Sequence, residues 1–224
     1  MFCLSQALTT IIIPSIKKTE KYTDLCIQSI EMHTLQEETP FEIIVENDKP
    51  FCKSINNGVK KAKGEFLVIL NNDAMVMKDW LVNFHRLYNI LSKKQNVGLV
   101  GTYFTGLPGN LQDLTSNQFI EKTLRLSPRI VMVCVFISKK TFFDVGGMDE
   151  SFPHGNFADD DLCIKCLEKG YTNWIAPFVT LHFGHSSFDN ENWKKDMGEG
   201  QNRMKLKFGE NWRNIYIKYE SLQK

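Results

Sequence analysis

The stretch Phe66-Leu67-Val68-Ile69-Leu70-Asn71-Asn72-Asp73 decides the fold, because five apolar residues run directly into three polar ones. A continuous apolar run of this length is typical of a strand buried on both faces of a parallel sheet. Similar runs precede it at Thr10-Ile11-Ile12-Ile13-Pro14 and Phe41-Glu42-Ile43-Ile44-Val45. Apolar residues at helical spacing separate these strands, from about 19 to 34 and from 54 to 63. The alternation predicts right-handed βαβ units with a ligand site at the carboxyl ends of the strands.

The rest of the chain continues the α/β pattern with more variation. It predicts helices at 78–93, 139–145 and 160–169, strands at 97–102 and 130–138, and edge segments at 173–175 and 179–183. Residues 103–128 are rich in Gly, Pro, Asn and Ser, which favours a surface excursion near the site. The polar tail from residue 190 is expected to be helical. A length of 224 residues favours one α/β domain with a mainly parallel central sheet flanked by helices.

Composition excludes several classes of function. A net charge of +1 provides no long-range field, so we expect no nucleic-acid partner. The apolar run from 130 to 137 is far too short to span a bilayer, and the first ten residues lack a basic leader region. The six cysteines lie mostly in apolar stretches, and the pair Cys163 and Cys166 has no second pair to complete a zinc site. We therefore expect a soluble, cytoplasmic protein with reduced, packed thiols and no transmembrane segment.

Three polar clusters are candidates for chemistry. Asn71-Asn72-Asp73 ends a buried strand, where a carboxylate can approach a phosphate through Mg²⁺ or Mn²⁺, although the same residues could form a turn that caps the next helix. Asp159-Asp160-Asp161 opens a helix. Acidic residues stabilise a helix N-terminus, yet mutual repulsion also raises the pKa of a carboxyl group and suits it to act as a general base. His182 ends an apolar strand close to Gly184, as a core histidine or as a metal ligand that would favour Mn²⁺.

Together these segments resemble the successive motifs of the family 2 glycosyltransferases, in particular the rhamnosyltransferase-like branch. The matching segments are 9–15, 42–47, 56–58, 62–65, 70–73, 143–150 and 157–163, followed by His182 and Ser186. The match extends from about residue 9 to 187. It implies a single GT-A domain, with a nucleotide-sugar-binding half at about 9–102, an acceptor-binding and catalytic half at about 127–187, and a helical tail at 188–224.

The resemblance also assigns roles to single residues. The nucleotide-sugar contacts it implies are Pro14, Ser15, Glu46, Asn56, Asn71 and Asn72. Asp73 matches the metal-binding acid of the DxD motif, and His182 matches a residue that completes the metal or diphosphate site. Asp159 matches the catalytic base. Asn71 replaces the first acid of DxD, Glu46 replaces the usual aspartate, and Ala158 replaces the glutamate before the base. This last departure leaves the choice between Asp159 and Asp160 open.

The activity implied by the resemblance is inverting sugar transfer that depends on Mn²⁺ or Mg²⁺. The donor would be a nucleotide-diphosphate sugar, with UDP or dTDP as the nucleotide, and the acceptor a hydroxyl of a glycan, a lipid-linked glycan or a glycoprotein. Asp149, Glu150 and Asp160 are acceptor-side candidates, although Asp149 and Glu150 could simply form a turn. A nicotinamide oxidoreductase is disfavoured because no GxGxxG follows the first strand. The remaining alternative is a non-catalytic module of the same fold that binds nucleotide sugars.

Overall fold

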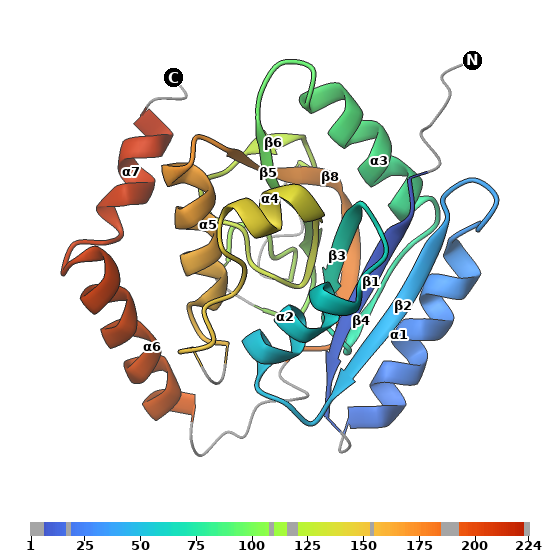
Figure 1. Cartoon of the computed structure of the whole chain (residues 1–224), viewed down its shortest axis with the longest axis horizontal. Coiled ribbons are helices and arrows are strands. Elements are labelled where there is room, and N and C mark those ends of the chain that lie inside the picture. The colour runs from blue at the N-terminus through green and yellow to red at the C-terminus, as the bar shows by residue number, and fades with distance from the viewer. Residues whose placement is uncertain are drawn as a thin grey trace.

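The computed structural model describes residues 7–16, 19–107, 110–115, 121–152, 155–184 and 193–221. Figure 1 shows the helices and strands in these ranges. The strands are β1 (Thr9–Ser15), β2 (Phe41–Asn47), β3 (Phe66–Leu70), β4 (Ala74–Met75), β5 (Val97–Phe104), β6 (Arg125–Leu126), β7 (Cys134–Ser138) and β8 (Thr172–His182). The helices are α1 (Glu20–His33), α2 (Phe51–Lys61), α3 (Trp80–Leu91), α4 (Lys139–Asp144), α5 (Ala158–Glu168), α6 (Trp193–Phe208) and α7 (Asn214–Ser221).

One central sheet organises the described chain, in the order β2-β1-β3-β7-β5-β8-β4, with β6 also pairing with β8. Strands β1, β2 and β3 are parallel, as the alternation predicts, and β5 and β8 are parallel to each other. Strand β7 lies between these two groups and is antiparallel to both β3 and β5. All five parallel strands therefore point the same way. The predicted fold class is confirmed, and the reversed β7 makes the sheet mixed.

Helices cover both faces of the sheet, because side chains alternate along each strand. Ile12 of β1 packs with α2 and α5, whereas Ile11 and Ile13 pack with α1 and α3. The tail helices α6 and α7 join the first of these two cores through Met204, which is fully buried, and Tyr216, and Trp212 between the two helices packs into the same core. The result is a three-layer arrangement that holds the carboxyl ends of β1 and β2 at the bottom of Figure 1.

Two predicted strands have different boundaries in the structure. The strand expected at 130–138 begins only at Cys134, because the backbone N–H groups of Ile130 and Val131 donate to the side chains of Cys163 and Gln112 rather than to a strand. The two segments expected at the sheet edge form one strand, β8, inside the sheet. Its pairing with β5 shifts register around Pro177, which lacks an N–H, so a bulge joins the two predicted parts.

Further expectations concern the loop at 103–128, the cysteines and the membrane. The loop was expected to lie outside the sheet, yet β5 extends to Phe104 and β6 pairs with β8. The described cysteines are free and buried: Cys26, Cys52, Cys134, Cys163 and Cys166. Burial is the main cause that raises the pKa of each of these thiols, which keeps them protonated. Among the described residues, no helix has both the length and the hydropathy that a bilayer-spanning segment needs.

Candidate active site

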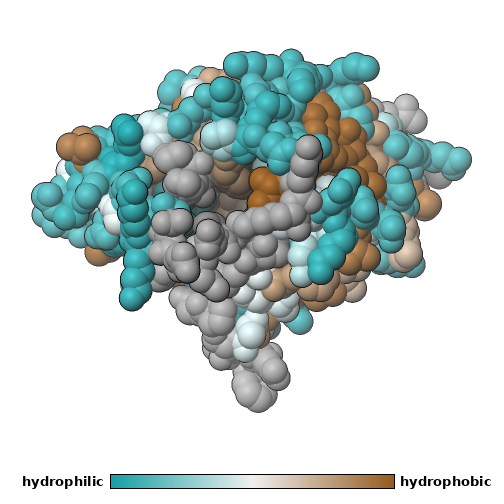
Figure 2. Space-filling model, turned by 90° about the horizontal axis from the view of Figure 1, so that it is seen from below, coloured by the Kyte–Doolittle hydropathy of each residue, from teal (hydrophilic) through white to brown (hydrophobic). Residues whose placement is uncertain are grey.

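The carboxyl ends of the first three strands form one polar edge. Pro14 and Ser15 of β1 pair in register with Glu46 and Asn47 of β2. Asn72 follows β3, and its amide nitrogen lies 3.4 Å from the hydroxyl of Ser15, within hydrogen-bond distance. Figure 2 shows the molecule from below, which is the side at which β1 and β2 end, and teal hydrophilic residues cover much of the coloured surface beside a brown hydrophobic band. This edge therefore brings together five of the predicted nucleotide-sugar contacts and the predicted metal ligand Asp73: Pro14, Ser15, Glu46, Asn71, Asn72 and Asp73.

Asn72 has contacts inside the protein that the sequence did not predict. Its Nδ2 donates to Thr19 Oγ1 at 2.7 Å and lies 3.2 Å from Thr23 Oγ1. Ser15 and Thr23 also share a hydrogen bond of 2.6 Å. These contacts tie the start of α1 to the ends of β1 and β3, so Asn72 shapes the edge. Its contact with a nucleotide sugar stays a prediction.

Glu46 is a buried carboxylate that is neutralised by two lysines. Its side chain is 1% exposed, and its oxygens contact Lys49 Nζ at 2.5 Å and Lys61 Nζ. Burial alone would raise the pKa of Glu46, but the hydrogen bonds and charges of the two lysines hold this pKa below its ordinary value. Glu46 is therefore ionised at neutral pH. It places two ammonium groups near the carboxyl end of β2.

Asn56 connects the two halves of the chain. Its Nδ2 donates to the carbonyl oxygen of Met148 and to Glu150 Oε1, both at 2.9 Å, and its Oδ1 accepts from the N–H of Met148 at 3.0 Å. The turn that it holds includes Gly147, whose φ of +67° lies in the left-handed region that glycine adopts readily. Asn56 and Glu150 are thus brought together, although Asn56 was predicted to contact the nucleotide sugar and Glu150 to lie on the side of the acceptor substrate.

Asp73 and His182 also meet, across 109 positions of sequence. Residue Ala74 pairs with His182 in the short antiparallel ladder between β4 and β8. His182 Nε2 lies 3.1 Å from Asp73 Oδ1 and 3.4 Å from the amide nitrogen of Asn71. Both the aspartate and the histidine are nearly buried, with side chains 6% and 4% exposed. His182 Nδ1 is buried without a hydrogen-bond partner in the described ranges.

Asp73 and His182 supply part of the ligand set that a divalent cation needs. Within the described ranges, no group of three or more His, Cys, Asp and Glu side chains forms a candidate metal site. A cation that binds together with a diphosphate needs only one or two protein ligands, because phosphate oxygens and waters supply the others. Asp73 and His182 fit that smaller role, and an imidazole ligand favours Mn²⁺.

The three consecutive aspartates have separate environments. Phe157, just before α5, has a φ of +66°, an uncommon conformation for a bulky residue that sets the direction in which the helix begins. Asp160 is 1% exposed and forms a two-point ion pair with Arg129, with distances of 2.8 and 3.2 Å. The hydroxyl of Tyr216 on α7 donates to the same carboxylate at 2.8 Å. These contacts occupy both Asp160 oxygens.

Asp161 belongs to a second ion-pair network. Its fully buried carboxylate lies 2.9 Å from Lys165 Nζ and 2.5 Å from Lys207 Nζ. Lys207, on α6, also contacts Asp149 at 2.9 Å. Burial would raise the pKa of Asp149, but hydrogen bonds from Ser151 and Lys207 hold it well below its ordinary value. Asp149 is therefore an ionised group that fastens α6 to the turn before α5.

Asp159 is the remaining aspartate of the three, and it forms no ion pair with any of the described residues. Its Oδ1 accepts the backbone N–H of Asp160 at 2.9 Å, and its side chain is half-buried. Burial first, and then the charge of Asp160, raise the pKa of Asp159 to about 7. A carboxyl group with this pKa exchanges protons near neutral pH. The geometry therefore supports Asp159 over Asp160 as a candidate base.

Sequence reasoning missed Arg129, Tyr216 and Lys207. Each is a single polar residue far along the chain from the aspartate that it contacts, and no local pattern marks such a pairing. The excess of three acids at one helix start was an indirect signal, because buried carboxylates require counter-charges. Ser186 lies outside the described residues.

This chain has limited sequence similarity to known proteins and a clear structural likeness to one solved structure. No protein-family model matches the chain. The chain is 27% identical over 168 residues to an uncharacterized protein, y4gI, from Sinorhizobium fredii, a match to 64% of this chain and 18% of that protein. It is also similar in structure to a crystal structure of GalNAc-T7 with UDP, GalNAc and Mn²⁺, with a TM-score of 0.66, 12% identity, and coverage of 89% of this chain and 48% of the other. The chain thus spans less than half the length of each.

The structural likeness establishes the fold of this chain. At 12% identity over 89% of its length, the shared arrangement of strands and helices is that of a GT-A-like domain. Fold alone does not define a reaction, so function has to be argued from the side chains at the site.

Proposed function

We propose that this protein is a glycosyltransferase that moves a sugar from a nucleotide-diphosphate donor to a hydroxyl group, with inversion at the anomeric carbon. The observation that carries the proposal is the contact between Asp73 and His182 at the carboxyl edge of a GT-A-like sheet. UDP is the first candidate nucleotide, because the structurally similar GalNAc-T7 is a complex with UDP, GalNAc and Mn²⁺. The rhamnosyltransferase-like motif at residues 70–73 extends the proposal to dTDP sugars.

The donor would bind along the polar edge, with the nucleoside near Pro14, Ser15 and Glu46 and the diphosphate near Asp73. Asp73 and His182 would hold Mn²⁺ or Mg²⁺, which neutralises negative charge on the diphosphate when it is bound. The lysines around Glu46 add positive charge to this edge. Such groups favour the transition state because charge on the leaving diphosphate grows as its bond to the sugar breaks.

Asp159 would accept the proton of the acceptor hydroxyl. The hydroxyl oxygen forms a new bond to the anomeric carbon while the bond from that carbon to the diphosphate oxygen breaks, and the electron pair leaves with the diphosphate. The raised pKa of Asp159 matches it to a hydroxyl nucleophile at neutral pH. Arg129 and Tyr216 hold Asp160 in its buried contacts, which leaves Asp159 as the proton acceptor.

The acceptor would be a hydroxyl of a glycan, a lipid-linked glycan or a glycoprotein. The free, buried cysteines support a reducing compartment, and we propose the cytoplasm. The division into a donor half at 9–102 and an acceptor half at 127–187 remains part of the proposal. Asn56, which bonds to Met148 and Glu150, would then couple the two halves.

A donor hydrolysis assay separates this enzyme from a non-catalytic module that binds nucleotide sugars. UDP and dTDP sugars are incubated with the protein and Mn²⁺, and release of the nucleoside diphosphate is measured. Slow release that is lost in Asp73→Ala supports a transferase. Tight donor binding without any release, even with a broad panel of acceptors, identifies a binding module instead.

The stereochemistry has its own test. Proton NMR of the first product formed from an α-linked donor reports the configuration at its anomeric carbon. A β-linked product supports inversion. An α-linked product would reject the inverting mechanism and leave sugar transfer intact.

A further inference from the structure

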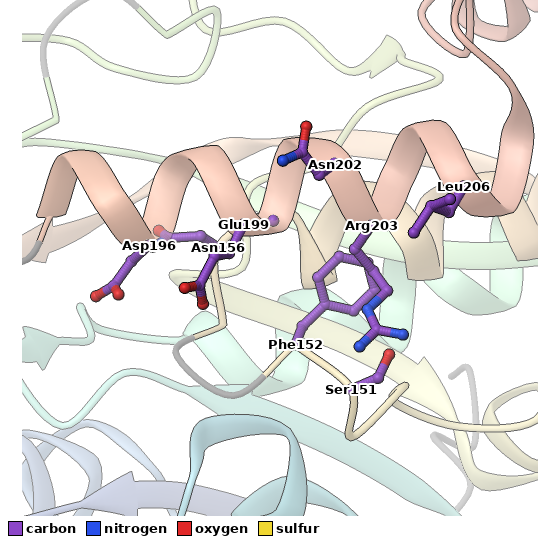
Figure 3. A pocket seen from close by; sticks show the side chains of 9 residues that line it. Ser151, Phe152, Asn156, Asp196, Glu199, Asn202, Arg203 and Leu206 are labelled. Carbon is purple, nitrogen blue, oxygen red and sulfur yellow. The ribbon is translucent and has the colours of Figure 1, made fainter.

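A cavity of about 390 Å³ lies between α6 and the turn that leads into α5. Its lining residues are Ser151, Phe152, Asn156, Asp196, Glu199, Gly200, Asn202, Arg203 and Leu206. In Figure 3 the side chains of Glu199, Arg203 and Leu206 lie on the side of α6 that faces Ser151 and Phe152. This volume falls within the range of about 300–1,000 Å³ that is usual for small-molecule sites.

The walls of this cavity are held in place by contacts on both sides. A Cβ added at Gly200 would lie 2.7 Å from the carbonyl oxygen of Asn156, so the absence of a side chain lets α6 approach the turn. About two helical turns further on, Lys207 of α6 contacts Asp149 and Asp161. The cavity is therefore a formed feature of the packed tail helix.

The polar groups of the lining indicate what the cavity can bind. Asn156 Nδ2 is a buried donor with no hydrogen-bond partner in the described ranges. Glu199 supplies acceptor oxygens, and Lys195 Nζ lies 3.9 Å from one of them. Asp196 and Glu199 against Arg203 leave a net charge of −1 on the lining, which disfavours an anionic ligand. Mixed carboxylate, amide and guanidinium groups suit a ligand with many neutral hydroxyls, which both donate and accept.

We propose that this cavity binds an uncharged sugar unit of the acceptor. The inference rests on the proposed transferase function, and it adds the class of acceptor: a glycan whose bound unit carries no carboxylate, sulfate or phosphate. Asn156 precedes Asp159 by three residues, so the cavity adjoins the segment that places the candidate base. The residues of the polar edge, where we place the donor at the ends of β1, β2 and β3, are not among those that line this cavity.

Glycan binding without any donor tests the proposal. Labelled protein is applied to an array of neutral oligosaccharides and of matched oligosaccharides that contain uronic acids. We expect binding to neutral glycans and weaker binding to the acidic ones. Glu199→Gln should weaken neutral binding about tenfold or more, because a hydrogen bond to an ionised acceptor is stronger than one to a neutral amide. Glu168→Gln is the matched control, since it makes the same change at the exposed far end of α5.

The outcomes separate this proposal from the proposed function. No binding to neutral glycans, equal binding by the Glu199 and Glu168 variants, or a preference for acidic glycans would overturn the cavity assignment. Arg203→Gln provides a second readout, because it should weaken neutral binding and should not create a preference for acidic glycans. Glycan binding in a protein that never releases nucleotide from a donor would keep the cavity assignment and reject the transferase.

Discussion

Replacing Asp159 with asparagine should lower the rate of sugar transfer without destabilising the fold. The substitution keeps the shape of a half-buried side chain and removes both its charge and its capacity to accept a proton. Transfer should fall by about 10²- to 10⁴-fold, the usual contribution of a general base. Donor affinity should be unchanged, because the donor edge is formed by β1, β2 and β3.

The same substitution should stabilise the fold in alkaline solution. Burial and the Asp160 charge raise the pKa of Asp159 from 3.8 to about 7, so ionisation of this group favours the unfolded state. The resulting cost is absent below pH 3.8, grows as the pH rises, and is complete above pH 7. At about 1.4 kcal/mol per pKa unit it reaches at most about 4 kcal/mol. Asp159→Asn removes this cost, and about 2–4 °C of Tm per kcal/mol is expected.

The assay measures transfer and Tm from pH 4 to pH 9 for the wild type, for Asp159→Asn and for Asp24→Asn. Asp24 is an exposed aspartate on α1 and controls for the chemical change. Wild-type transfer should rise about tenfold per pH unit up to about pH 7 and then level off. The Tm advantage of Asp159→Asn should shrink towards pH 4. Full transfer by Asp159→Asn would refute the reasoning. So would a wild-type transfer rate that does not rise with pH and level off near pH 7.

Three further outcomes follow from the contacts of the site. Donor binding, measured by calorimetry, should be lost in EDTA and in Asp73→Ala, whereas undiminished binding without metal would exclude a metal-bridged diphosphate. His182→Ala should reduce turnover far more than it lowers Tm, and a variant that chiefly unfolds would identify a core histidine. Tyr216→Phe removes a hydrogen bond to the buried Asp160 carboxylate and should cost about 1–3 kcal/mol of stability by denaturant unfolding. An unchanged unfolding midpoint would show that α7 does not depend on this bond.

Much of the fold could be predicted because its elements are continuous and strongly apolar. The run at 66–70 is observed as β3 without any shift, and β2 begins at the predicted residue. The orientation of β7 could not be predicted, because a fully buried strand has the same pattern in parallel and antiparallel pairing. The sequence also predicted two separate segments where the structure has the single strand β8. The local pattern does not reveal that pairing with β5 resumes beyond the bulge at Pro177.

The candidate site was predictable as a set of residues and less so as an arrangement. The strand ends predicted a shared edge, and Asp73 and His182 do meet there. The separate environments of Asp159 and Asp160 depend on Arg129 and Tyr216, which are distant in sequence. Asp160→Asn should lower stability, because this change leaves Arg129 without its buried counter-charge.

Anomalous diffraction from a crystal of the protein with a UDP sugar and Mn²⁺ tests the central claim most directly. The account predicts a manganese peak in contact with Asp73 and His182, with the diphosphate bound to the same ion and the uridine along the ends of β1 and β2. A manganese peak away from this pair, or a nucleotide bound elsewhere on the molecule, would contradict it.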